Sequence, residues 1–279
     1  MRRLLTAVVV LVFLGAAATW AWRELSGRAQ RLLPDECVAE VSKDGETLDA
    51  SLDLEQAQHA ALIAAIAVRR ELPARAATIA IATAIQESKL YNLQYGDRDS
   101  LGLFQQRPSQ GWGTAAQILD PTYAIGAFYD ALVRIDGYET MRITEAAQLV
   151  QRSAFPEAYA DHEPEGRALA SALTGESAAA FSCRMGSIPG GRSASVARDE
   201  ITGVFGDLVG TPVVAGRAVT VQVPGKRLGW ALAQYLVAQA DRLGIRRVAF
   251  GGQAWSGKER WDDAETPART VRIDLATTG

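Results

Sequence analysis

The sequence predicts a mainly α-helical domain over residues 36–183, a linker over residues 184–197 and a small α/β domain over residues 198–279. Apolar residues at helical spacing, bounded by capping residues, dominate the first region, and alternating apolar residues appear after the linker. A long apolar segment precedes both domains. The chain of 279 residues is 48% hydrophobic and 22% charged, which is typical of a folded protein.

The N-terminal segment indicates where the chain is expected to work. Arg2 and Arg3 precede residues 4–22, which carry no charge and are long enough to span a bilayer. Residues 1–22 are expected to be a transmembrane anchor or, with the alanines at 16–18 as a cleavage site, a signal peptide. Residues 23–35 then form a stalk. Both alternatives place the remainder outside the cytoplasm, either on a single-pass membrane protein or secreted.

Five helices are expected in the first domain. Their starts follow from capping side chains and from prolines, which suit the first turn of a helix: Asp53, Pro73, Asp120, Thr144 and Pro156. The second helix is nearly all apolar over residues 76–85 and is expected to be buried on every side. Residues 92–113 are expected to be irregular.

The second domain is expected to contain strands over residues 219–223, 246–250 and 270–275, and a helix over residues 228–243. Residues 252–258 have the spacing of a phosphate loop. Glu259 stands where that loop requires a serine or threonine for magnesium, so nucleotide binding is not expected. Trp255 and Trp261 either form a ligand platform or pack in a core.

Composition excludes several function classes. The net charge of −3 argues against nucleic-acid binding. The two histidines, His59 and His162, are too few and too far apart for a zinc peptidase, and we expect neither a metal nor another cofactor. Cys37 and Cys183 are the only cysteines, and an oxidising compartment would allow a disulfide between them.

Glu87 is the candidate catalytic residue. It lies at the end of the apolar helix, where a carboxylic acid would be partly buried. Cleavage of a glycosidic bond needs such an acid, because the leaving oxygen must be protonated as the bond breaks. The pattern alone fits better with an ordinary solvated glutamate in the last turn of a helix.

Two short motifs add to this reading. Glu87-Ser88 is followed, eighteen residues after the glutamate, by Gln105 at the end of the sequence Gly-Leu-Phe-Gln. This arrangement resembles the soluble lytic transglycosylases and goose-type lysozymes, which share a lysozyme-like fold and carry Glu-Ser and then Gly-Leu-Met-Gln. Residues 95–113 and 151–160 resemble an actinobacterial exported branch of the same superfamily. The resemblance covers residues 53–173.

The resemblance implies a role for each matching residue. Glu87 takes the place of the catalytic acid, and Ser88 that of a serine near acid and substrate. Gly102 and Gln105 match the segment that lines the sugar cleft, and Tyr159 matches a tyrosine that faces the acid. The usual Ala-Tyr-Asn-Ala-Gly block is absent.

The implied reaction is cleavage of the bond between N-acetylmuramic acid and N-acetylglucosamine in peptidoglycan. A lytic transglycosylase needs only Glu87, whereas a hydrolase needs a second carboxylate, for which Asp97 and Asp99 are candidates. The alternative for these two aspartates is ordinary turn chemistry with a local salt bridge. Trp112 either stacks on a sugar or closes a small core. The rival function is a wall-binding scaffold that has lost turnover.

Overall fold

The structure, a computed structural model, describes residues 34–43, 45–152 and 157–277. Of these, 44% are helical and 19% lie in strands. The predicted anchor or signal peptide, residues 1–22, and most of the stalk lie outside the described residues. Within the described ranges, no helix has the length and apolar character needed to cross a membrane.

The predicted fold class, a mainly α lysozyme-like domain with a small α/β domain behind it, is wrong. The helices of the described chain pack against two antiparallel sheets, with strand orders β2-β1-β3 and β4-β5-β9-β6-β7-β8. The first sheet lies inside the region predicted to be all-helical. The second sheet has no parallel pair, so its strands are not joined as in an α/β domain.

The first sheet explains why the prediction failed. Its strands are β1 (Glu36–Lys43), β2 (Glu46–Leu52) and β3 (Phe181–Arg184). Cys37, Ala39 and Val41 alternate inward along β1, and Ala50 and Leu52 do the same on β2. This alternation is short, and β3 comes from the far end of the region.

Helices fill the sequence between β2 and β3. They are α2 (Leu54–Arg69), α3 (Ala74–Ser88), α4 (Ala115–Ile118), α5 (Pro121–Leu132), α6 (Ile143–Gln151) and α7 (Glu163–Leu173), with the short 3-10 helices η1 (Pro108–Gln110) and η2 (Ala160–His162). Asp53 caps α2 in a reciprocal pair with Gln56, as expected. The expected cap at Thr144 is wrong, because Arg142 occupies the N-cap position of α6 and Thr144 lies inside the helix.

The remaining elements follow β3. They are α8 (Ala194–Phe205), the 3-10 helix η3 (Gly206–Leu208), β4 (Val213–Ala215), β5 (Ala218–Gln222), α9 (Lys226–Ala238), α10 (Ala240–Leu243), β6 (Ile245–Phe250), β7 (Gln253–Trp255), β8 (Asp262–Asp263) and β9 (Thr270–Leu275). Each predicted strand overlaps β5, β6 or β9. The predicted helix over residues 228–243 is divided into α9 and α10.

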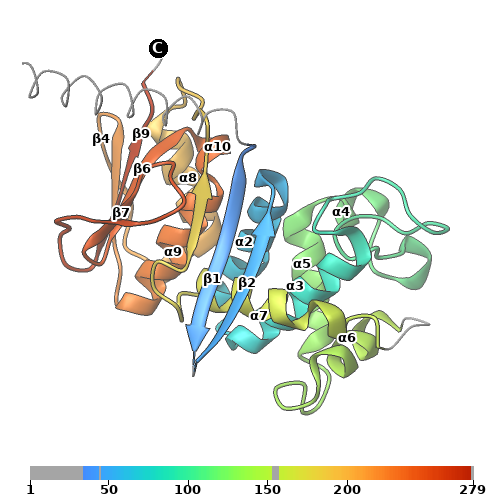
Figure 1. Ribbon diagram of the computed structural model, residues 1–279. Coiled ribbons are helices and arrows are strands. Elements are labelled where there is room, and N and C mark those ends of the chain that lie inside the picture. The colour runs from blue at the N-terminus through green and yellow to red at the C-terminus, as the bar shows by residue number, and fades with distance from the viewer. Residues whose placement is uncertain (1–33, 44, 153–156, 278–279) are drawn as a thin grey trace, which may run out of the picture.

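Helix α2 lies between the two halves of the molecule. It packs against α3, α5 and α7 on one side and against α8 and α9 on the other. Figure 1 shows the six-stranded sheet with α8 and α9 at the left, β1 and β2 in the middle, and α3 to α6 at the right. The end of α3, which carries Glu87, therefore belongs to the right-hand half.

A buried glutamine joins the two halves. Gln234 of α9 is fully buried, and its Oε1 accepts hydrogen bonds from the backbone N–H groups of Ala180 and Phe181, both at 2.8 Å. Its Nε2 donates to the carbonyl oxygens of Ala172 and Ser177. One side chain thus satisfies the backbone polar groups where α7 ends and β3 begins.

The predicted disulfide is confirmed. Cys37 of β1 and Cys183 of β3 lie opposite each other in the sheet and are bonded, and both are fully buried. The bridge spans 146 residues of sequence, so it closes a loop that contains every helix from α2 to α7.

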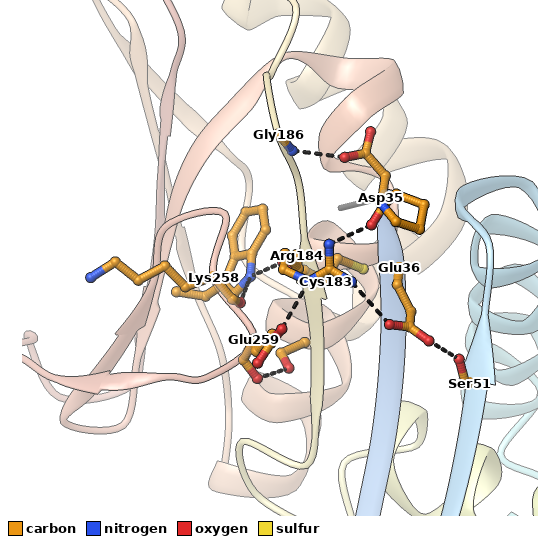
Figure 2. Close-up of polar contacts among 11 residues, drawn as sticks. Asp35, Glu36, Ser51, Cys183, Arg184, Gly186, Lys258 and Glu259 are labelled. Carbon is orange, nitrogen blue, oxygen red and sulfur yellow. Dashed lines mark hydrogen bonds and ion pairs between the residues drawn. The ribbon is translucent and has the colours of Figure 1, made fainter. Parts of the chain in front are cut away.

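Arg184 extends this junction beyond the sheet. Its buried guanidinium lies 3.1 Å from a carboxylate oxygen of Glu36 and 2.8 Å from one of Glu259 (Figure 2). The indole N–H groups of Trp255 and Trp261 donate to carbonyl oxygens of Cys183 and Phe181. Both tryptophans therefore pack against β3 and cover its outer edge, which answers the alternative left open for them.

Removal of the disulfide is expected to lower the free energy of unfolding by about 2–5 kcal/mol, because the open chain gains conformational entropy when it unfolds. Urea titration of the Cys37→Ala, Cys183→Ala chain against the parent chain measures this. Equal unfolding midpoints for the two chains would show that strand pairing and the Arg184 contacts hold β1 and β3 together without the disulfide.

Candidate functional site

The candidate acid lies at a helix end with an unusual backbone. Helix α3 is buried over most of its length, and Glu87, in its last turn, is half-buried. After Ser88 the next two residues, Lys89 and Leu90, adopt left-handed φ values of 53° and 63°. Such values are costly for residues other than glycine and persist where the surroundings hold them.

Helix α2 holds these two residues in place. Gln56 donates from Nε2 to the carbonyl oxygen of Lys89 at 2.9 Å. His59 donates from Nδ1 to the carbonyl oxygen of Leu90 at 2.7 Å. The turn that follows Glu87 is thereby fixed by two side chains of a neighbouring helix.

Tyr159 lies directly beside the acid, where the resemblance places it. The hydroxyl of this buried side chain donates to Oε1 of Glu87 at 2.7 Å. Three residues later, His162 of η2 forms a hydrogen bond of 2.9 Å with the side chain of Gln86. One segment therefore holds two consecutive side chains of α3, and the described residues give Glu87 no other hydrogen bond to its side chain.

The side chain of Ser88 forms a hydrogen bond with the loop that carries the second motif, Gly-Leu-Phe-Gln. Its buried hydroxyl lies 2.7 Å from the carbonyl oxygen of Leu103 and 3.0 Å from that of Ala84. From α6, Gln151 donates to the next loop carbonyl, that of Phe104, at 2.7 Å. Ser88 is therefore a positioning residue for the loop rather than a side chain that lines an open surface.

Gly102 and Gln105 shape the same loop. At Gly102 φ is +76°, and a Cβ there would lie 2.8 Å from the carbonyl oxygen of Ile118, so glycine is required. The half-buried Gln105 folds back on its own loop, with Nε2 at 3.3 Å and 3.2 Å from the carbonyl oxygens of Tyr95 and Gly102.

The two candidate second carboxylates have other surroundings. Asp99 accepts hydrogen bonds from the backbone N–H and the hydroxyl of Ser109, and from Arg107 at 2.7 Å. The contacts from Ser109, and then that from Arg107, hold the pKa of Asp99 well below its usual range. The side chain of Asp97 is 92% exposed and lies 3.9 Å from Arg98. Neither carboxylate contacts Glu87 within the described chain.

Trp112 lies apart from the Glu87–Tyr159 pair. It is half-buried against the core and lines a groove of about 740 Å³ together with Tyr123. Among the described residues, no hydrogen bond or ring contact joins it to the acid. The structure thus brings together Glu87, Ser88 and Tyr159, keeps Gly102 and Gln105 in the adjoining loop, and leaves Asp97, Asp99 and Trp112 outside the group.

Several residues that build the site were missed by sequence reasoning. Gln56, His59, Gln86, Gln151 and His162 hold the acid, its turn or its loop through single hydrogen bonds. Their partners lie between 31 and 76 residues away in the sequence. Only Gln56 carried a signal, and that signal concerned its capping of α2.

Comparison of the chain with protein-family models and with curated proteins found no match.

The His59 contact predicts a pH dependence of stability. Burial lowers the pKa of His59, and the backbone acceptor Leu90 and the carboxylates of Glu55 and Asp53 offset this only in part. In the unfolded chain the His59 imidazole takes up a proton as the pH falls through about 6.5, whereas in the folded chain it does so only at a lower pH. The unfolded state therefore binds more protons than the folded state just below about pH 6.5. The free energy of unfolding should therefore fall as the pH drops through about 6.5.

Urea titrations between about pH 7.5 and pH 5 measure this fall. The His59→Asn chain keeps a side-chain donor without a titrating ring and is expected to show a shallower decline. The His162→Asn chain is the matched control, because His162 is the only other histidine. An undiminished decline in the His59→Asn chain would contradict the assignment.

Proposed function

We propose that this protein cleaves the bond between N-acetylmuramic acid and N-acetylglucosamine in peptidoglycan, with Glu87 as its general acid and base. The observation that carries the proposal is the 2.7 Å hydrogen bond from Tyr159 to Oε1 of Glu87. It orients the carboxyl group, and no described residue forms a hydrogen bond with Oε2, the oxygen proposed to meet a substrate. The same pair of residues is implied by the resemblance of the two motifs to lytic transglycosylases.

The proposed reaction has two proton transfers. Glu87 first gives its proton to the glycosidic oxygen, and the bond from that oxygen to C1 of the muramyl sugar breaks. The C6 hydroxyl of the same sugar then attacks C1, and the carboxylate of Glu87 takes the hydroxyl proton. The products are a free 4-hydroxyl and a 1,6-anhydro ring, and Glu87 returns to its starting state.

The positions of the aspartates support this route over hydrolysis. A retaining or inverting hydrolase requires a second carboxylate at the bond. Asp99 accepts three hydrogen bonds from its own loop, and Asp97 faces solvent. A route that needs one carboxyl group fits these residues better than a route that needs two.

We also propose that the chain works outside the cytoplasm, held to the membrane or released from it. The disulfide supports this location, because such bonds persist in oxidising compartments. Peptidoglycan is then the expected partner, and the net charge of −3 gives no basis for a nucleic-acid partner.

Digestion of purified peptidoglycan by the full chain tests the proposal, with the soluble products identified by mass spectrometry. We expect muropeptides that end in 1,6-anhydro-muramic acid. Products with a reducing end would mean a hydrolase and would overturn the single-carboxylate route. Binding of peptidoglycan without any soluble product would overturn the proposed enzymatic activity and favour a wall-binding scaffold.

A further inference from the structure

A second candidate binding surface is the groove of about 740 Å³ that Trp112 lines. It is bounded by the end of the irregular loop, by α5 and by the last turn of α6. Trp112 and Tyr123 supply aromatic surface, and Leu149, which is 54% exposed, adds an apolar patch. Flat aromatic and apolar surfaces in a groove are typical of sites that take sugars or small organic groups.

The charges of the groove are unbalanced. Arg134 and Arg152, both exposed in its lining, make no ion pair with any residue that the structure describes. The one carboxylate in the lining, Asp130, is paired with Arg70 at 2.5 Å. The groove therefore offers two guanidinium groups, each able to bind a carboxylate through paired N–H donors.

The groove adjoins the loop of the candidate site. Gln151 lines the groove, and its Nε2 donates to the carbonyl oxygen of Phe104. The preceding carbonyl, that of Leu103, accepts from Ser88, which follows Glu87. The Leu103–Phe104 segment is therefore held from one side by the residue after Glu87 and from the other by a residue of the groove.

We propose that this groove binds the carboxylate-bearing peptide arm of the muramyl sugar, with Arg134 and Arg152 as its anion-binding residues. The ligand class rests on the proposed function. Glycan strands without peptides lack these carboxylates, so the groove would favour strands that still carry them. Trp112 and Tyr123 would contact the uncharged part of the same ligand.

Binding measured without turnover separates this proposal from the proposed function. Isothermal titration of the full Glu87→Gln chain is carried out with a soluble tetrasaccharide muropeptide and with chitotetraose, which carries no carboxylate. We expect the muropeptide to bind at least about tenfold more tightly. Adding Arg134→Gln and Arg152→Gln should remove that preference, and lysine at both positions should restore part of it.

The matched control removes the same charge elsewhere. Arg192 and Arg246 also lack a described ion pair, and their replacement by glutamine should leave the preference unchanged. Equal binding of the two ligands, or an equal loss in the control chain, would overturn the proposal. A lower melting temperature of the Arg134→Gln, Arg152→Gln chain with its preference intact would also overturn it, since the arginines would then serve only the helix ends. If the full chain prefers the muropeptide over chitotetraose but the parent protein yields no cleavage products, the proposal for the groove stands and the proposed enzymatic function is overturned.

Discussion

Replacement of Glu87 by glutamine is expected to lower the rate of peptidoglycan cleavage by about 10²–10⁴-fold. The amide keeps the shape of the side chain and an oxygen for the Tyr159 hydroxyl, which lies 2.7 Å from Oε1 in the parent chain. It cannot give a proton to the glycosidic oxygen. Release of soluble muropeptides per unit time, with the unfolding midpoint of both chains in urea, measures the loss of rate at constant stability.

Two companion variants make this result specific. Tyr159→Phe removes the hydroxyl that orients the acid and is expected to cost about tenfold, because the carboxyl group remains but is less well placed. Glu139→Gln removes an exposed carboxylate and should not change the rate. A Glu87→Gln chain with the rate of the parent would exclude Glu87 as the acid.

Replacement of Gln234 by leucine is expected to lower the free energy of unfolding by about 3–4 kcal/mol. Leucine fills the space but leaves the N–H groups of Ala180 and Phe181 buried without their acceptor. The carbonyl oxygens of Ala172 and Ser177 lose a donor as well. Urea titration followed by circular dichroism measures the change.

Gln239→Leu is the matched control for this variant. Gln239 is also buried and directly follows α9, but it makes fewer hydrogen bonds: Nε2 donates to the carbonyl oxygen of Gln58, and Oε1 accepts from the half-exposed Arg242, so no backbone N–H loses its acceptor. Gln239→Leu should therefore lower the free energy of unfolding clearly less than Gln234→Leu does. Equal losses for the two variants would mean that burying leucine there, rather than the broken network, causes the instability.

The helices of this protein could be predicted because their signals are local. Asp53 with Gln56 and Asp120 with Pro121 mark helix starts within four residues of sequence, and the structure uses both. The sheets are different. Strand β1 pairs with β3 across more than a hundred residues, and no local pattern states that pairing.

The first hairpin was within reach of the sequence. Buried residues alternate along residues 37–41 and 48–52, and the dipeptide Asp44-Gly45 between them is a common hairpin signal. The capping pair that follows at Asp53 drew attention to the helix instead. The wrong fold class came from this omission and from assigning the residues after the linker to a small α/β domain.

The candidate site divides in the same way. Glu87 and Tyr159 could be named from motifs, and the structure places their side chains in contact. The two residues that fix the turn after Glu87, Gln56 and His59, could not be predicted. Their hydrogen bonds to backbone carbonyl oxygens depend on how α2 lies against α3. Glutamine and histidine at these positions carry no pattern that identifies their partners.

The bridge between Cys37 and Cys183 also determines how the molecule bears load. A tension applied to the two ends of the chain passes from β1 to β3 through the covalent bond, and the backbone of residues 38–182 forms a closed loop outside that covalent path. Helix α3 and Glu87 belong to that loop. When the chain is pulled between a fixed N-terminus and a bound C-terminal part, the bridge therefore prevents extension of the backbone that carries the candidate site, and reduction of the bridge removes that protection.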